Sequence, residues 1–170
     1  MHGEGEARQL AALAQVHDRL GHAGLDYWLF GGWAVDFYAG SVTRSHDDVD
    51  IAVWLDDLPR IASLLEEDGW RHAPHEDEDG GTGYEREGVR LELMFLSRGP
   101  AGEAFTPFAH GRADWGDATF GDDARELDGV RARLMALEPL RLGKSFPRED
   151  LEDAVKDRAD FERLSRVAPG

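Results

Sequence analysis

Residues 30–54, FGGWAVDFYAGSVTRSHDDVDIAVW, decide how this chain folds. The stretch starts at the end of a hydrophobic run, passes the pair Gly31-Gly32 and continues as a short helical pattern. After a polar loop it enters a second apolar run, residues 48–54, which carries two acids. This order predicts a strand, a tight turn into a helix, a loop and a second strand.

The second apolar run places two carboxylates on one face of a strand. Side chains at positions i and i+2 point the same way, so Asp48 and Asp50 project together. The apolar residues of the run face the core on the other side: Val49, Ile51 and Val53. Two adjacent carboxylates repel each other, and a divalent cation such as Mg²⁺ relieves the repulsion. An acidic pair is also common on solvated faces, so the preceding turn and loop are what favour a metal site here.

The glycine pair predicts a phosphate-binding turn. Gly31 and Gly32 let the backbone approach a ligand closely, and the helix N-terminus offers free N–H groups to phosphate oxygens. A plain strand-to-helix turn is the alternative. In the loop beyond, the planar guanidinium of Arg44 suits phosphate oxygens, and His46 either orients the loop or touches phosphate. For Asp36, tethering this loop and reaching an acceptor both stay open.

A further acid lies inside an apolar strand. The pattern predicts a hairpin that turns at Glu87-Gly88 and continues as a strand over residues 89–96, with Glu92 in its middle. An unpaired carboxylate there would be costly, so Glu92 needs an arginine partner or a metal. A salt bridge with Arg86 or Arg90 is the alternative to metal ligation.

The remaining pattern predicts an α+β fold in a single domain over residues 1–170, with a sheet core over about 22–135 and C-terminal helices over about 136–167. Helices are expected over residues 4–20, 33–38, 58–68, 137–142 and 148–167. Strands are expected over residues 27–30, 48–54, 70–73, 82–86, 89–96, 124–127 and 130–135. Residues 97–117 are expected to be loop-rich; their aromatic side chains, Phe105, Phe108 and Trp115, would stack on a base or sugar or fill core.

Charge and composition limit the partners. The formal net charge is −16, from 35 acidic against 19 basic residues, which disfavours nucleic acid and suits a cationic small molecule. Simple solubility explains the same charge equally well. The chain has no cysteine, no apolar run long enough to cross a bilayer and no signal-peptide pattern, so we expect a cytoplasmic protein without a membrane partner.

The central stretch resembles a known family. GGWAVD at residues 31–36, Gly40 and TRSHDDVD at residues 43–50 follow the pattern of the small antibiotic nucleotidyltransferases, which include aminoglycoside 2″-adenylyltransferases and lincosamide nucleotidyltransferases. The resemblance covers about residues 25–165 and includes KDRADF at residues 156–161. It implies the polymerase β-like nucleotidyltransferase fold, a mixed sheet flanked by helices with a C-terminal helical segment.

The resemblance also implies roles for individual residues. Asp48 and Asp50 would hold two Mg²⁺ ions, and Glu92, where the family usually has Asp, would be the third carboxylate as metal ligand, general base or both. The nucleotide-binding residues would be Gly31, Gly32, Arg44, His46 and Lys144. A plain surface lysine is the alternative for Lys144, while Asp157 and Asp160 are interpreted as structural.

The implied reaction moves AMP, or another nucleoside monophosphate, from a nucleoside triphosphate to a hydroxyl, with ATP as the expected donor. The expected acceptor is a small molecule of the aminoglycoside or lincosamide type. Two alternatives stay open: a nucleotidyltransferase acting on a protein or tRNA, as toxin–antitoxin relatives do, and a catalytically silent nucleotide-binding domain. A homodimer is also left open.

Overall fold

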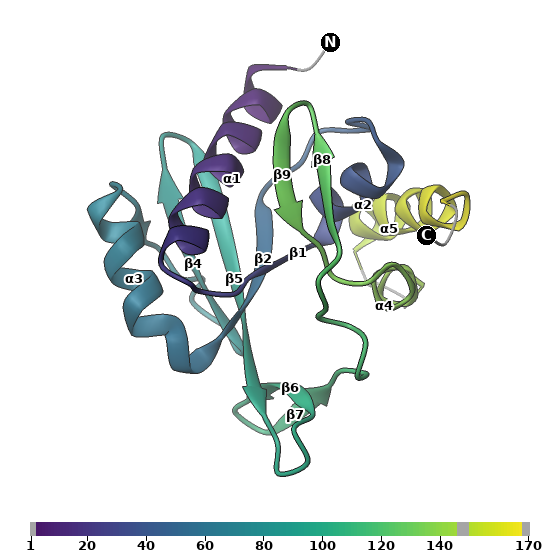
Figure 1. The fold of residues 1–170 in the computed structure, drawn as a ribbon. Helices are drawn as coiled ribbons and strands as arrows, with labels where there is room; N and C mark the ends of the chain where they lie inside the picture. Colours follow the sequence, from purple (N-terminus) through teal and green to yellow (C-terminus); the bar gives the residue numbers. More distant parts are fainter. Residues whose placement is uncertain (1–2, 146–149, 168–170) are drawn as a thin grey trace.

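A mixed β-sheet forms the centre of the molecule in the computed structural model, which describes residues 3–145 and 150–167 (Figure 1). Its strands run in the order β1-β2-β5-β4-β3, and only the β2–β5 pair is parallel within this order. The strands are β1 (Trp28–Phe30), β2 (Val49–Trp54), β3 (Arg71–His72), β4 (Gly81–Arg86) and β5 (Val89–Arg98). The expected mixed sheet is thus confirmed.

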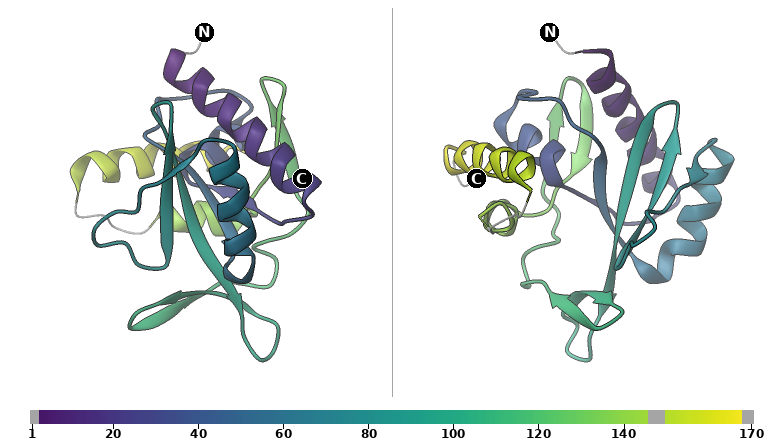
Figure 2. Two further views of the ribbon diagram at one scale, coloured as in Figure 1. Left: turned by 90° about the vertical axis from the view of Figure 1, so that its left-hand side faces the viewer. Right: turned by 180° about the vertical axis from the view of Figure 1, so that it is seen from behind.

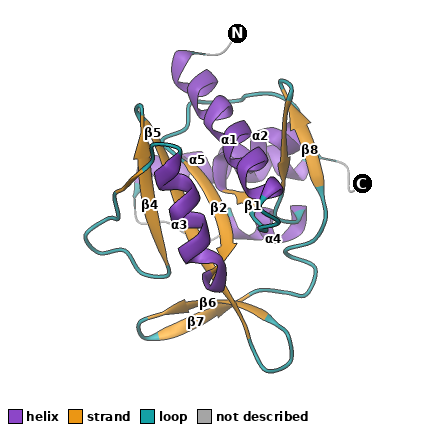
Figure 3. Cartoon of the chain, turned by 60° about the vertical axis from the view of Figure 1, so that its left-hand side comes forward, coloured by secondary structure: helices purple, strands orange, loops and turns teal. Residues whose placement is uncertain are grey.

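Two helices, α1 (Glu4–His22) and α3 (Leu58–Glu67), cover one face of this sheet (Figures 1 and 3). A short 3₁₀ turn, Leu55–Asp57, leads from β2 into α3. The apolar stripe of α1 is buried in the same core as the strand residues that face it, including Leu13, Leu20, Ile51 and Leu91.

Three more helices gather beyond β1: α2 (Gly31–Ala39), α4 (Leu137–Gly143) and α5 (Leu151–Ser165) (Figures 1 and 2). The middle of α2 is buried, because this helix lies between the sheet and α5. The start expected for the last helix, Arg148, lies outside the described residues. Within residues 3–145 and 150–167, no helix combines the length and apolar character needed to cross a bilayer.

Two hairpins complete the chain. The hairpin of β8 (Ala124–Leu127) and β9 (Val130–Arg133) lies beside α1, close to where it was expected (Figure 1). The sequence pattern, which indicated a loop-rich segment over residues 97–117, missed a second hairpin there, formed by β6 (Ala104–Phe108) and β7 (Gly111–Asp114). β6 pairs with the end of β5 across a short loop, and the glycines and prolines of this segment, which are uncommon in strands, pointed to loop instead.

The register of the sheet determines which side chains lie beside the acidic pair. Asp50 lies opposite Phe30 on β1 and opposite Glu92 on the parallel strand β5. On the other face of β2, Val49 and Ile51 are buried, as the alternation predicted. Asp48 comes just before the strand begins, so the acidic pair lies at the end of β2 that receives the loop from α2.

Candidate active site

The turn from β1 into α2 brings the backbone against Asp50. Gly31 has a φ of 70°, in the left-handed region that favours glycine. A Cβ added there would overlap Asp50 Oδ2 and lie 3.1 Å from Asp50 Cγ. At Gly32, a Cβ would lie 2.5 Å from Arg44 Nη2 and 2.6 Å from His46 Nδ1. The absence of both side chains therefore lets β2 and the following loop approach the first turn of α2.

Asp48 and Asp50 form the acidic centre of the site. Burial raises the pKa of Asp50 well above its usual value, and the charge of Asp48 and a hydrogen bond with its carboxyl act in the same direction. The charge of Glu92 adds to the increase, whereas Lys144 lowers the pKa of Asp50. Burial and the neighbouring negative charges thus both disfavour the ionised form of Asp50, and a bound cation would favour it.

The donor set of this pair fits Mg²⁺. Mg²⁺ prefers carboxylate oxygens and is usually held by one or two carboxylates together with substrate phosphates. Asp48 and Asp50 supply those carboxylates. Within the part of the chain that the structure describes, no three His, Asp or Glu side chains are grouped so that they could hold a metal ion. A metal ion held by this pair would therefore need further oxygen ligands from a substrate.

Glu92 lies next to Asp50 in the sheet, but its side chain contacts other partners. Glu92 Oε1 accepts a hydrogen bond from Arg90 Nε and lies 3.0 Å from His75 Nε2. Burial, followed by a hydrogen bond with Glu78, raises the pKa of Glu92, while Arg90 acts in the opposite direction. The alternative salt bridge with Arg90 is thus present. The role of Glu92 as metal ligand or base stays a prediction, and it requires this side chain to leave its present partners.

Asp36 fastens the loop between α2 and β2. Its carboxylate is fully buried, accepts a hydrogen bond from Thr43 Oγ1 and lies 2.6 Å from His46 Nε2. The imidazole of His46 also packs against the indole of Trp33, with ring centroids 4.5 Å apart. Of the two roles left open for each residue, the structure therefore shows loop tethering by Asp36 and loop orientation by His46.

The two cations expected to contact phosphate are held by α5. Arg44 Nη2 lies 2.9 Å and Lys144 Nζ lies 3.1 Å from Asp160 Oδ2, and Asp160 is only 1% exposed. Burial alone would raise the pKa of Asp160, but Arg44 and Lys144 outweigh it and hold that pKa below its usual value. The structural interpretation of Asp160 agrees with these contacts.

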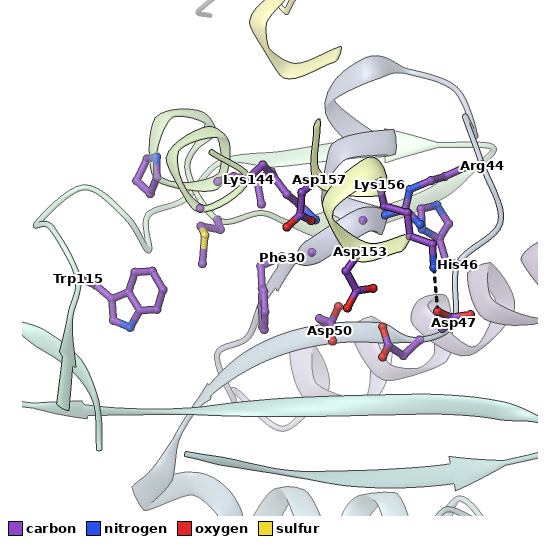
Figure 4. Close-up of a pocket in the computed structure, with 17 residues that line it drawn as sticks. Phe30, Arg44, His46, Asp47, Asp50, Trp115, Lys144, Asp153, Lys156 and Asp157 are labelled. Carbon is purple, nitrogen blue, oxygen red and sulfur yellow. Dashed lines mark hydrogen bonds and ion pairs between the residues drawn. The ribbon is translucent and has the colours of Figure 1, made fainter. Parts of the chain in front are cut away.

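One cavity of about 510 Å³ collects most of these groups. All of the nucleotide-binding residues expected from the sequence line it, together with the acidic pair: Gly31, Gly32, Arg44, His46, Lys144, Asp48 and Asp50. Figure 4 shows Trp115 at one end of the cavity and Arg44 at the other, with Asp50 between them. The cavity thus has an apolar end and an end where basic and acidic side chains both line the wall: Arg44, Lys144, Lys156, Asp47, Asp153 and Asp157.

The sequence did not single out Lys156 as a site residue, although it lines this cavity. Its Nζ lies 3.2 Å from Asp47 Oδ2, the contact drawn as a dashed line in Figure 4. Lys144 and Lys156 are the only lysines in the chain. That scarcity, together with the position of Lys156 at the start of the KDRADF segment, was the signal that could have identified it.

A second cavity, of about 360 Å³, meets the first at the acidic pair. Both cavities are lined by Phe30, Asp48 and Asp50. The wall beyond these shared residues is rich in acid and includes Glu92 and residues of the loop before β4 and of β6: His75, Glu78, Asp79, Thr106 and Phe108. The two carboxylates therefore face a partly cationic space on one side and an acidic space on the other.

The chain is similar in sequence to known antibiotic nucleotidyltransferases. The family described as aminoglycoside-2″-adenylyltransferase matches residues 12–111. A lincosamide resistance protein from Staphylococcus haemolyticus is 33% identical over 63 residues, which are 37% of this chain and 39% of that protein. A 2″-aminoglycoside nucleotidyltransferase from Klebsiella pneumoniae is 37% identical over 46 residues, 27% of this chain and 26% of that protein. The chain therefore aligns with well under half the length of each curated relative.

The overall fold is shared with a solved structure. The lincosamide antibiotic adenylyltransferase LnuA, with lincomycin bound, superposes with a TM-score of 0.73 over 92% of this chain and 96% of that one. The two sequences are 21% identical, so this likeness establishes the fold alone. The expected nucleotidyltransferase fold is confirmed.

Proposed function

The chain belongs to the aminoglycoside-2″-adenylyltransferase family, and we propose that it transfers a nucleoside monophosphate from a nucleoside triphosphate to a hydroxyl of a small cationic molecule. This proposal rests on the arrangement of two neighbouring cavities. The groups suited to phosphate line one cavity, an acidic wall lines a second, and the two cavities meet at Asp48 and Asp50. A reaction between two different ligands needs such a junction.

We place the triphosphate at the end of the first cavity that Arg44, Lys144 and Lys156 line. The free N–H groups at the start of α2, beside Gly31 and Gly32, would contact phosphate oxygens. Arg44, Lys144 and Lys156 would balance the negative charge that shifts onto pyrophosphate. The base would lie at the apolar end, which is lined by Trp115, Met135, Pro139 and Leu140.

The proposed reaction is a substitution at the α-phosphorus of the triphosphate. The acceptor hydroxyl oxygen attacks the α-phosphorus, the bond from that phosphorus to the bridging oxygen breaks, and pyrophosphate leaves. We propose that Glu92 accepts the hydroxyl proton once its carboxylate has left Arg90 and His75. Two Mg²⁺ ions, held by Asp48 and Asp50 in the proposed site, would supply charge neutralisation and lower the pKa of the hydroxyl.

The acceptor would occupy the second cavity. Its wall brings together Glu78, Asp79 and Glu92, and the whole chain carries a net charge of −16. Both features attract a polycation and act more weakly as salt screens them. We therefore propose an aminoglycoside-type acceptor ahead of a lincosamide-type one.

Replacing Glu78 by Gln should raise the KM for a cationic acceptor about 2- to 5-fold, because an exposed ion pair contributes roughly 0.2–1 kcal/mol. Glutamine keeps an oxygen to accept the hydrogen bond that Glu78 now receives from the His75 N–H at 2.8 Å. Steady-state kinetics at two salt concentrations would measure the effect, and the difference from wild type should shrink at high salt. The matched control is Glu76→Gln, in the same loop but outside the cavity wall. Equal KM values for the two variants would contradict this placement of the acceptor.

Mass spectrometry of reactions with Mg²⁺, ATP and a panel of acceptors would test the proposed function. We expect an aminoglycoside to gain the mass of one AMP unit while pyrophosphate is released. AMP transfer to lincosamides alone would overturn the cationic acceptor. Nucleotide binding without transfer to any small molecule would overturn the small-molecule acceptor and leave the two alternatives, a protein or tRNA acceptor and a catalytically silent nucleotide-binding domain.

A further inference from the structure

The N-terminal helix contributes one buried amide to the surroundings of the site. Gln9, on α1, is 7% exposed. Its Oε1 accepts a hydrogen bond from the indole Nε1 of Trp33 at 3.2 Å, and its Nε2 donates one to the backbone oxygen of His46 at 2.8 Å. A single side chain thus joins α1, α2 and the loop that follows α2.

The two partners of Gln9 belong to the layer that shapes the cavity. His46 is held through its ring by Asp36 and by packing on Trp33, as described above. Its Nδ1 occupies the space beside Gly32 where a Cβ would otherwise lie. Gln9 holds the backbone of the same histidine, so that both the ring and the main chain of His46 are fixed.

The amide is well suited to this position because it satisfies one donor and one acceptor at once. Buried polar groups are nearly always hydrogen-bonded, and leaving one unpaired is unfavourable. An apolar residue at position 9 would leave the Trp33 N–H and the His46 carbonyl without this partner. These two groups could then form hydrogen bonds to water only if the loop moved and exposed them. Arg44 lies in that loop and would move with it.

We propose that Gln9 is a positioning residue for the triphosphate site. It acts through Trp33 and His46, sets the loop over residues 43–47 against the start of α2, and thereby fixes the guanidinium of Arg44 relative to the N–H groups that would receive phosphate. Gln9 is not part of the cavity wall. It also precedes the family match, which begins at residue 12. The inference rests on the proposed function only in taking a triphosphate as the ligand of this loop.

Gln9→Met tests the proposal, because methionine has a similar length and cannot replace the two hydrogen bonds. We expect the KM for the nucleotide and its calorimetric Kd to rise roughly 10-fold, because a displaced Arg44 guanidinium would lose charge-assisted hydrogen bonds to phosphate. The KM for the acceptor should stay within about 2-fold, and kcat should change less than the nucleotide KM. The control is Gln15→Met, at an exposed position of the same helix, which should match wild type throughout.

A second variant and a spectroscopic readout separate positioning from general stability. Gln9→Glu keeps the acceptor for Trp33, and its ionised form has no proton to donate to the His46 carbonyl, so nucleotide binding should weaken at a pH where this carboxyl is ionised. A lower unfolding temperature with wild-type nucleotide Kd in both Gln9 variants would overturn the proposal. If wild type itself binds no nucleotide, the proposed function fails. The NMR resonances of the His46 ring and Arg44 Nε then decide: shifted signals in Gln9→Met support positioning, and unchanged signals overturn it.

Discussion

Replacing Asp50 by Asn should abolish nucleotidyl transfer while leaving the metal-free protein at least as stable as wild type. Burial and the charges of Asp48 and Glu92 raise the pKa of Asp50, so its ionised form destabilises the folded state at neutral pH. Asparagine removes that charge with little change in shape. Metal-assisted catalysis supplies several kcal/mol, so kcat/KM should fall roughly 1000-fold or more.

The raised pKa of Asp50 also determines how the free energy of unfolding should change with pH. A carboxyl whose folded-state pKa is raised binds its proton more tightly in the folded protein than in the unfolded chain. The contribution of Asp50 to the free energy of unfolding should therefore become more favourable as the pH falls through its raised pKa. Asp50→Asn should lack this component when unfolding is followed in the presence of a chelator.

The matched control for this experiment is Asp56→Asn, an exposed carboxylate just beyond the same strand. It should retain wild-type activity and stability. Loss of activity in Asp50→Asn accompanied by a clearly lower free energy of unfolding would contradict the interpretation, because the substitution would then act by disrupting the fold.

Gly31→Ala should lower kcat/KM by about 100-fold, because the new Cβ would overlap Asp50 Oδ2 and push the carboxylate out of place. The left-handed backbone at this position, with a φ of 70°, should also cost roughly 1–2 kcal/mol of stability for a residue with a Cβ. Steady-state kinetics and chemical denaturation would measure the two effects separately.

Gly40→Ala provides a control that isolates the backbone effect. Gly40 ends α2 with a φ of 80°, and a Cβ added there would meet no atom within 4 Å. This variant should lose a similar amount of stability and keep its activity. Equal losses of activity in Gly31→Ala and Gly40→Ala would show that backbone strain, and not the contact with Asp50, explains the result.

The centre of the site could be predicted from the sequence because it is local. Strand, turn, helix, loop and strand follow one another within residues 30–54, and the alternation along β2 assigned Asp50 to one face and Ile51 to the other. The cavity collects the predicted residues of this stretch together with Lys144, which came from the family resemblance. Whether each of them contacts a nucleotide stays a prediction.

The long-range pairings could not be predicted. Hydrophobic periodicity indicates which side chains are buried, but it does not indicate which carboxylate a given cation will meet. The ion pair between Arg44 and Asp160 spans 116 positions, and Lys156 meets Asp47 across 109. The contact of Glu92 with His75 could not be predicted either, because it depends on how the acidic loop that contains His75 folds back onto the sheet.

The most direct test compares ATP labelled at the α-phosphate with ATP labelled at the γ-phosphate, using wild type, Asp50→Asn and an aminoglycoside in the presence of Mg²⁺. We predict that wild type moves the α label to the acceptor, releases the γ label as pyrophosphate, and does neither when a chelator is added or Asp50 is replaced. Transfer of the γ label to the acceptor, or transfer of the α label that survives in Asp50→Asn, would contradict nucleotidyl transfer centred on Asp48 and Asp50.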